Sequence, residues 1–399
     1  MPEIDDIDVT FIGHPFASIG MGEQMRSHIA AANKLQLGHG VFDIFRYAER
    51  RDPAHFALIG ERERASVPRG IRVFHINGDE VDRVIEAFET RGNDFAGGYN
   101  VIMPAWELPS YPREWAAKLA RFDEVWAISG FVQEGLAAAG IGSHRIGQSI
   151  ETEPMAFLPR RFFGIRESSF VLLHFLDLTS YAARKNPHAV LELARQLWAE
   201  QPFLDLHLVL KVKNGDQPAE AWADEFRGNP RVTVLDTPLD SVGVRSLINC
   251  CDCFVSLHRA EGFGRGLGEA MALGKLALGT GWSGNLDFMT PENSLLAAHR
   301  LTRLKREQYP HWQGQSWAEA DVAHAAKLLR GVLADGERAR SLALRGQMEA
   351  LRSHGHRAVG LRILARLRHI AATSPKLAPP SGGPPRRGRG AAAMTAAAA

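Results

Sequence analysis

The sequence predicts an α/β protein in which two Rossmann-like, doubly wound domains face each other across a cleft. Short β-rich runs alternate with amphipathic helical stretches, which is typical of a parallel sheet with helices on both faces. Some runs are almost continuously apolar, such as Phe-Val-Leu-Leu-His-Phe-Leu at 170–176, as in a buried parallel strand. The alternation stops near residues 151–167 and then starts again, and 399 residues suit two domains of ordinary size.

The first half of the chain is predicted to form an N-terminal domain of residues 1–160. Its apolar runs and amphipathic stretches alternate regularly along the sequence. The expected strands are 8–12, 41–45, 71–76, 99–103 and 124–128, and the expected helices are 22–33, 80–90, 113–121 and 131–139.

The second half repeats the pattern and is predicted to form a second domain of residues 168–316. Its apolar runs again alternate with helical stretches, which is typical of a parallel, doubly wound sheet. The expected strands are 170–175, 206–211, 232–235, 253–257 and 276–279, and the expected helices are 187–199, 239–248 and 266–273.

The C-terminal region is expected to be helical and then disordered. Residues 317–373 are rich in Ala, Leu and Arg with apolar residues at helical spacing, so we predict helices over 317–372. We expect the last of them to pack back on the N-terminal domain. Residues 373–399 are basic and rich in Pro, Gly and Ala, and such a segment cannot build a core.

Composition narrows the functional classes and the location. The net charge of +2 gives no strong attraction to nucleic acid. The only three cysteines, Cys250, Cys251 and Cys253, crowd together and are read as small buried residues. The acidic N-terminus lacks an apolar segment, and no run approaches the roughly 20 apolar residues of a membrane span. A cytoplasmic protein is expected, with the basic tail free for weak peripheral contact with a membrane.

The most informative stretch is the glycine-rich segment 256–275. A buried strand is expected to end at Leu257, and a helix to begin near Arg265 after a turn containing Gly262, Gly264 and Gly266. The first N–H groups of a helix have no internal acceptors and, with the helix dipole, favour an anion. Glycines in the turn let a ligand approach the backbone closely. The segment therefore predicts an anion site.

Two acids frame this turn, and their pattern resembles a known family. Glu261 is followed by Gly-Phe-Gly, and Glu269 comes eight positions after it. This resembles the signature of glycosyltransferase family 4, which implies a GT-B fold and a nucleoside-diphosphate sugar as donor substrate. The resemblance implies that Glu261 faces the donor sugar and Glu269 the ribose hydroxyls. It also implies that backbone N–H groups near Phe263 and Gly264 meet the sugar or the phosphates.

A second candidate site follows the first strand of the second domain. Asn186 and Pro187 suit the start of a helix, so Lys185 lies just ahead of a positive helix end. A Lys there can pair with a diphosphate, and the resemblance places such a Lys at this position. Family members often carry an Arg several residues earlier, whereas Thr179 and Ser180 occupy that region here. The candidates for the missing charge are Arg184 and Arg265.

Other loops are expected at the same edge of the sheets. The loop at 280–287 occupies the place of a family loop near the donor, and Lys211 ends another strand. In the first domain, Gly20 and Gly22 follow the first strand but lack the third glycine of a dinucleotide motif. The resemblance implies that this loop approaches the donor phosphate. The candidates in the 280–287 loop are Ser283, Gly284 and Asn285.

The acceptor side departs from the resemblance. Many family members carry a His near the reacting sugar, where this chain has Trp106-Glu-Leu-Pro109. Glu107 is the expected replacement and a candidate catalytic residue together with Glu261. His14 and His258 are the alternatives by loop position.

The predicted reaction is transfer of a sugar to a hydroxyl of a sugar or lipid-linked acceptor. Retention of the anomeric configuration and a role in polysaccharide or glycolipid assembly are implied by the resemblance. No Asp-x-Asp cluster stands in the cleft loops, so neither a metal nor another cofactor is expected. Two alternatives stay open, a dinucleotide-dependent oxidoreductase and a non-catalytic nucleotide-sugar-binding protein or partner subunit. The base, sugar, acceptor and oligomeric state are not specified by the sequence.

Overall fold

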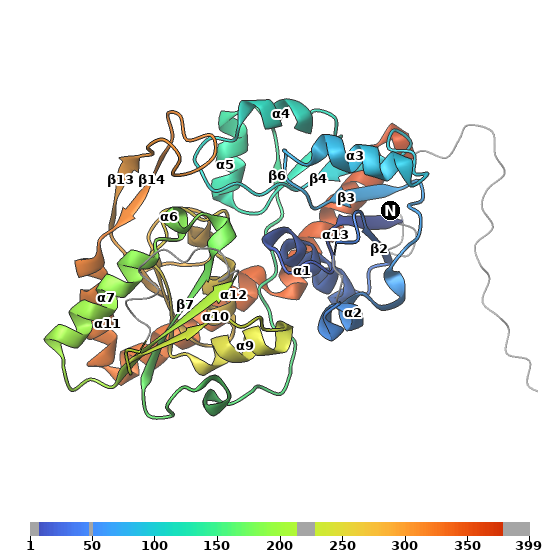
Figure 1. The fold of residues 1–399 in the computed structure, drawn as a ribbon. Coiled ribbons are helices and arrows are strands. Elements are labelled where there is room, and N and C mark those ends of the chain that lie inside the picture. Colours follow the sequence, from blue (N-terminus) through green and yellow to red (C-terminus); the bar gives the residue numbers. More distant parts are fainter. Residues whose placement is uncertain (1–7, 48–50, 214–227, 378–399) are drawn as a thin grey trace, which may run out of the picture.

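The computed structural model, which describes residues 8–47, 51–213 and 228–377, has the two-domain α/β architecture that the sequence predicts. Each domain contains a six-stranded sheet with helices packed against it (Figure 1). A two-stranded hairpin extends from the second domain, and helices at the C-terminal end lie beside both domains.

The first sheet has the strand order β2-β1-β3-β4-β5-β6, and all of its pairs are parallel. The order reverses between β1 and β3, which lie side by side although β2 separates them in the chain. The strands are β1 (Val9–Gly13), β2 (His39–Asp43), β3 (Ile71–Phe74), β4 (Tyr99–Ile102), β5 (Glu124–Ala127) and β6 (His144–Arg145); the helices are α1 (Gly20–Lys34), α2 (Pro53–Ile59), α3 (Val81–Thr90), α4 (Arg113–Leu119) and α5 (Gly130–Ala138).

The second sheet has the order β12-β11-β10-β7-β8-β9 and is also parallel. Its order reverses between β7 and β10, both of which are apolar and largely buried, as expected for central strands. The strands are β7 (Phe170–Asp177), β8 (Leu206–Lys213), β9 (Val232–Leu235), β10 (Cys253–Ser256), β11 (Leu276–Thr280) and β12 (Leu295–Ala297); the helices are α6 (Ala182–Lys185), α7 (Pro187–Glu200), α9 (Ser241–Cys250) and α10 (Arg265–Ala272).

The expectation of helix from residue 317 onward is wrong at its start. β13 (His299–Arg303) and β14 (Ser316–Ala320) form an antiparallel hairpin. Tertiary contacts outweigh the helical propensity of this segment, because Ala318 N donates to Arg259 O at 3.0 Å and Arg259 pairs with Glu319 at 2.7 Å. The helices begin afterwards as α11 (Val322–Leu333), α12 (Gly336–His354) and α13 (His356–Thr373).

Helix α13 packs against α1 of the first domain (Figure 1). A Cβ on Gly360 would lie 2.7 Å from Ala31 O, so this glycine permits close approach of the two helices. Arg366 of α13 also donates two hydrogen bonds to the buried Glu124 carboxylate, both at 2.6 Å. The C-terminal helices therefore join the two domains.

The segment expected to be disordered from residue 373 is ordered at its start. Residues Pro375–Leu377 form a short 3-10 helix, and Lys376 pairs with Asp123 at 2.7 Å. The acidic N-terminal residues 1–7 and the remaining tail, 378–399, lie outside the described residues. Among the helices that are described, none is both long and apolar enough to span a membrane.

Candidate functional site

A cavity of about 1280 Å³ opens between the two domains. In doubly wound sheets, ligands bind beyond the carboxyl ends of the strands, at the point where the strand order reverses. In the second sheet, β7 leads to Lys185 and β10 leads to the glycine-rich turn, and these two strands flank the reversal. Lys185 and the turn residues Phe263 and Gly264 all line this one cavity.

The beginning of α10 presents unpaired backbone donors to the cavity. Within the described parts of the chain, the N–H groups of 263–266 make no hydrogen bond, and the first bond at this end is Gly268 N to Gly264 O at 3.2 Å. Gly264 has φ +86°, and a Cβ there would lie 3.0 Å from Asn285 Cβ. Glycine is therefore needed for the turn that aims these donors, and the resulting site favours an anion.

Lys185 and Glu261 form an ion pair at the wall of the cavity. Lys185 Nζ lies 2.5 Å from Glu261 Oε1, and Arg184 Nη1 lies 3.2 Å from Glu261 Oε2. Burial alone raises the pKa of the Glu261 carboxyl, but the charges of Lys185 and Arg184 outweigh it and bring the pKa below its ordinary range. Glu261 is therefore ionised at neutral pH and accepts hydrogen bonds.

The two candidates for a second phosphate-binding charge line the cavity but already have protein partners. Arg184 is buried and donates to Ala260 O at 3.0 Å and to Ser180 Oγ at 2.7 Å. Arg265 donates to Ser149 O at 3.0 Å and pairs with Glu269 at 2.8 Å. Lys211 also lines the cavity and donates to Val212 O at 2.7 Å; burial lowers the pKa of its ammonium group.

The loop at 280–287 lies behind the glycine-rich turn and outside the cavity lining. Ser283 Oγ accepts a hydrogen bond from Glu261 N at 2.9 Å, and a Cβ on Gly284 would lie 2.1 Å from Gly262 O. The side chain of Asn285 accepts from His258 Nε2 at 3.1 Å, and both residues are fully buried. These residues hold the turn that carries Glu261 in place.

In the first domain, Gly20 lines the cavity and Gly22 does not. A Cβ on Gly22 would lie 2.3 Å from Ala17 O, so this glycine permits the tight turn before α1. His14 is not part of the cavity lining either, and its Nε2 lies 3.2 Å from Oε1 of Glu80, which does line the cavity. In the second domain, Asn186 directly precedes α7, as predicted. Its side chain donates to Leu257 O at 3.0 Å instead of capping the helix.

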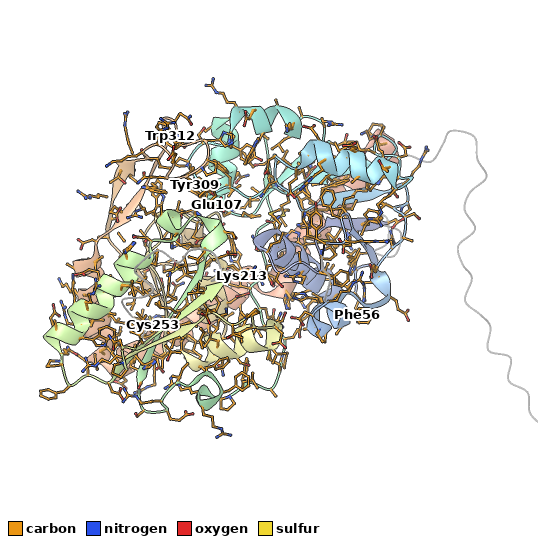
Figure 2. All side chains as sticks on the ribbon, in the orientation of Figure 1. Phe56, Glu107, Lys213, Cys253, Tyr309 and Trp312 are labelled. Carbon is orange, nitrogen blue, oxygen red and sulfur yellow. The ribbon has the colours of Figure 1, made fainter. Side chains whose placement is uncertain are left out.

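Glu107 lines the cavity from the first domain. Its Oε2 accepts a hydrogen bond from Tyr309 Oη at 2.6 Å, and Arg184 Nη2 lies 4.0 Å from its Oε1. Tyr309 belongs to the loop between β13 and β14, and Figure 2 shows it beside Glu107 at the junction of the hairpin and the first domain. Tyr309 could not be predicted as a site residue from the sequence, because no motif marks it and it is distant in sequence from Glu107.

Part of this site matches a known family. Residues 171–303 match the family model described as Glycosyl transferases group 1. This segment runs from β7 to β13 and includes Lys185, the glycine-rich turn and Glu269. No curated protein matches the chain.

Solved structures resemble almost the whole chain. The Anabaena protein Alr3699/HepE, in complex with UDP and glucose, has 16% identity and a TM-score of 0.63, over 91% of this chain and 100% of that one. Sucrose-phosphate synthase from Thermosynechococcus elongatus has 15% identity and a TM-score of 0.64, over 92% and 100%. The pneumococcal O-GlcNAc transferase GtfA, in complex with UDP and GlcNAc, has 10% identity and a TM-score of 0.58, over 91% and 99%. The fold is GT-B.

In this GT-B protein, the two domains contact each other across the cleft. Asp52 caps α2 by accepting from Ala54 N, and its other oxygen accepts from Ser241 N and Ser241 Oγ, both at 2.7 Å. Ser129 Oγ also donates to Gly262 O at 2.5 Å. An Asp before a Pro, as at Asp52, is a recognisable helix start, but nothing in the sequence pairs this residue with α9.

Another residue that the sequence analysis missed is Arg245 of α9, which lines the cavity. Within the described ranges, it forms no ion pair within 4.0 Å, whereas Arg184 and Arg265 are paired. A lone Arg within a helix carries no sequence signal that distinguishes it from a solvated charge. No cluster of three or more potential metal ligands occurs within the described residues.

Proposed function

We propose that this protein transfers a sugar from a nucleoside-diphosphate sugar to an acceptor hydroxyl, with retention of the anomeric configuration. The observation that carries the proposal is the shared cavity, which is lined both by the start of α10, with its unpaired N–H groups, and by Lys185. A diphosphate leaving group gains negative charge in the transition state, and fixed donors stabilise that charge. The family model and the GT-B fold support the same reaction class.

Lys185 is proposed to gain a second partner when the donor binds. In the structure, its ammonium group is paired with Glu261 at 2.5 Å. A diphosphate above α10 offers a second anion to the same ammonium group, so Lys185 bridges the phosphates and Glu261. Arg184 then remains the main counter-charge of Glu261, at 3.2 Å.

Glu261 is proposed to face the donor sugar as an ionised acceptor. Because its pKa is below the ordinary range, it does not act as an acid that protonates a leaving group. Its carboxylate instead accepts hydrogen bonds from sugar hydroxyls and stabilises positive charge that develops on the sugar ring. Glu107, on the opposite wall, is proposed to contact the acceptor side of the reacting centre.

The second acid of the motif is proposed to bind the ribose. Glu269 lines the cavity one helical turn beyond Arg265, which pairs with it at 2.8 Å. The arginine holds the carboxylate in one orientation, and two ribose hydroxyls can donate to its oxygens. Because similar GT-B structures contain UDP, uridine nucleotides are the first donors to test. Polysaccharide or glycolipid assembly is the proposed context.

A thermal-shift screen with UDP, GDP and their common sugar conjugates tests the proposal. A ligand that binds only the folded state raises the unfolding temperature, so one nucleoside diphosphate is expected to stabilise the protein. Lys185→Ala is expected to abolish most of this shift. Lys327→Ala, an exposed lysine on α11, is the matched control and should keep it.

Turnover separates catalysis from binding alone. Incubation with the stabilising nucleotide sugar should release nucleoside diphosphate through slow hydrolysis, and NMR of the released or transferred sugar should show the donor's anomeric configuration. Stabilisation without any release would favour the non-catalytic binder. Absence of any shift with every nucleotide would overturn the proposed function.

A further inference from the structure

The geometry points to a second binding site, a pocket beside Glu107 that holds an uncharged pyranose ring between aromatic side chains of both domains. We assign this pocket to the acceptor sugar, and that assignment rests on the proposed function. The pocket has a volume of about 310 Å³, at the lower end of the range of small-molecule sites. It opens into the main cavity, because the two share wall residues, namely Asn77, Asp79, Ala105, Glu107, Ser180 and Arg184.

Four aromatic rings line this pocket, and they come from three separate parts of the chain. Trp106 and Trp115 lie 5.2 Å apart between ring centroids, and Trp106 lies 5.7 Å from Tyr309. Tyr181 lies 4.8 Å from Tyr309 on the second-domain side. Aromatic walls with a few polar groups are typical of small-ligand sites, and the apolar C–H face of a pyranose packs well on such rings.

Tyr181 is held at the pocket in an unusual backbone conformation. Its φ is +59°, a region that bulky side chains rarely adopt, and the residue is 46% exposed. Such conformations cost of order 1–3 kcal/mol and persist where the surrounding structure fixes them, often at ligand sites. Ser180, directly before Tyr181, and Arg184, three residues after it, line both the cavity and the pocket.

The polar groups of the pocket suit hydroxyl groups and disfavour anions. Asp79 is exposed, and its carboxylate forms no hydrogen bond or ion pair with the described part of the chain. Glu107 accepts from Tyr309 and has lone pairs left for a ligand donor. The one guanidinium in the wall, Arg184, is already paired with Glu261. Two carboxylates therefore face the ligand, and a phosphorylated or carboxylated sugar would be repelled.

The hairpin loop that completes the pocket is anchored to the first domain. Gln315 Nε2 donates to Ser110 O at 2.7 Å, and Ser110 N donates back to Gln315 Oε1 at 3.1 Å. His311 packs against the Trp115 ring at 4.8 Å and lies 3.5 Å from Glu114. Tyr309 is thus fixed against the first domain, so the pocket needs residues from both domains.

Saturation-transfer NMR with simple sugars tests this site on the full chain. The probes are the methyl α-glycosides of glucose, galactose, mannose and N-acetylglucosamine, with glucuronic acid and glucose 6-phosphate as anionic counterparts. At least one neutral glycoside is expected to bind more tightly than both anionic sugars. Trp115→Ala and Tyr181→Ala should each weaken it about tenfold, since each removes a stacking wall. Trp312→Ala, on the same loop but outside the pocket wall, is the matched control and should leave binding unchanged.

Nucleotide titrations on the same variants separate this site from the donor site. Both pocket variants should keep the affinity for the stabilising nucleoside diphosphate, which also shows that they are folded. Equal binding of neutral and anionic sugars, or unchanged binding in both variants, would overturn the pocket. Donor hydrolysis without glycoside binding would also overturn it while the proposed function stands. Glycoside binding at Trp115 without any nucleotide binding would support the pocket and remove the proposed function.

Discussion

Glu261 brings the two candidate motifs into contact, because its carboxylate pairs with Lys185 and Arg184 after β7 while its backbone belongs to the turn after β10. Its backbone N–H is fixed by Ser283 Oγ at 2.9 Å. The carboxylate is therefore ionised, oriented and close to the cation that we assign to the phosphates. These three properties are what stabilisation of a charged transition state requires.

The first prediction concerns the charge of this residue. Glu261→Gln keeps the shape of the side chain but removes its charge, so turnover should fall by about 10²–10³-fold. Affinity for the nucleoside diphosphate alone should stay within a few-fold, because Lys185 loses a competing anion. Rates of donor hydrolysis and calorimetric titration with the diphosphate measure the two effects. Turnover within tenfold of the unchanged protein would contradict the assigned role.

The second prediction concerns the glycine that supports the turn. A Cβ on Gly284 would lie 2.1 Å from Gly262 O and 2.6 Å from Phe263 N, so Gly284→Ala must displace the anion-binding turn. We expect a loss of stability of roughly 1–3 kcal/mol and weaker nucleotide binding. Gly38→Ala is the control, since nothing lies within 4 Å of a Cβ there. Thermal unfolding and nucleotide titration of both variants check the expectation; equal behaviour of the two would be inconsistent with this packing.

At this scale, the sequence could place some candidate residues at the cavity but not others, even among residues such as His258 and Glu261 that follow the same strand. Lys185, Glu261 and Glu269 are brought into one cavity, because their positions follow directly from strand ends and a helix start. His258 and Asn285 also follow strand ends, but they hydrogen-bond to each other in the interior. The direction in which a loop side chain points depends on neighbours distant in sequence, which the pattern does not contain.

At the scale of elements, one helix cap also joins the domains. Asp52 caps α2 with one oxygen and accepts from Ser241, the first residue of α9, with the other. Through this contact, the helix starts of α2 and α9 meet at one side of the cleft. Domain opening must break it, so the carboxylate stabilises both a helix and the closed arrangement.

The third prediction separates these two effects. Asp52→Ala should cost about 1 kcal/mol of stability through the lost cap and should also shift the domains toward an open arrangement. Asp335→Ala removes an equivalent cap, from α12, without touching the other domain. Both variants should therefore unfold at lower temperature, but only Asp52→Ala should show a larger radius of gyration in small-angle scattering. The same radius in both would show that Asp52 does not hold the domains together.

The hairpin shows where element prediction failed. Residues 316–320 read Ser-Trp-Ala-Glu-Ala, and nothing local in them excludes a helix. Their strand conformation comes from pairing with β13 and from the contact of Ala318 with Arg259. The alternating strands and helices of the two sheets could be predicted because each carries its own period of apolar residues.

For the whole molecule, buried neutral histidines predict how stability depends on pH. Burial lowers the pKa of His28, His39, His174 and His354 to about 4, from an ordinary value near 6.5. The unfolded chain therefore binds more protons than the folded one between these values, and stability falls as the pH drops from about 6.5 toward 4. Each histidine should contribute a loss of about 1–2 kcal/mol between pH 7 and pH 5.

Thermal unfolding at pH 7 and at pH 5 measures this fourth prediction. The unfolding temperature should be clearly lower at pH 5. His28→Gln and His174→Asn place an amide nitrogen where each ring donates to a backbone carbonyl, so they should reduce the dependence on pH. An unfolding temperature that is constant or higher at pH 5 would exclude neutral burial of these rings.

The central claim concerns the whole cleft, in which α10 and Lys185 hold a diphosphate between two domains. The measurement that tests it most directly is calorimetric titration of the unchanged protein and of Lys185→Ala with UDP, UMP and uridine, or the guanosine series if GDP is the stabilising nucleotide. The account predicts that affinity falls from diphosphate to nucleoside, and that Lys185→Ala weakens the diphosphate at least tenfold but leaves the nucleoside unchanged. Equal binding of diphosphate and nucleoside, or an equal effect of the substitution on both, would contradict it.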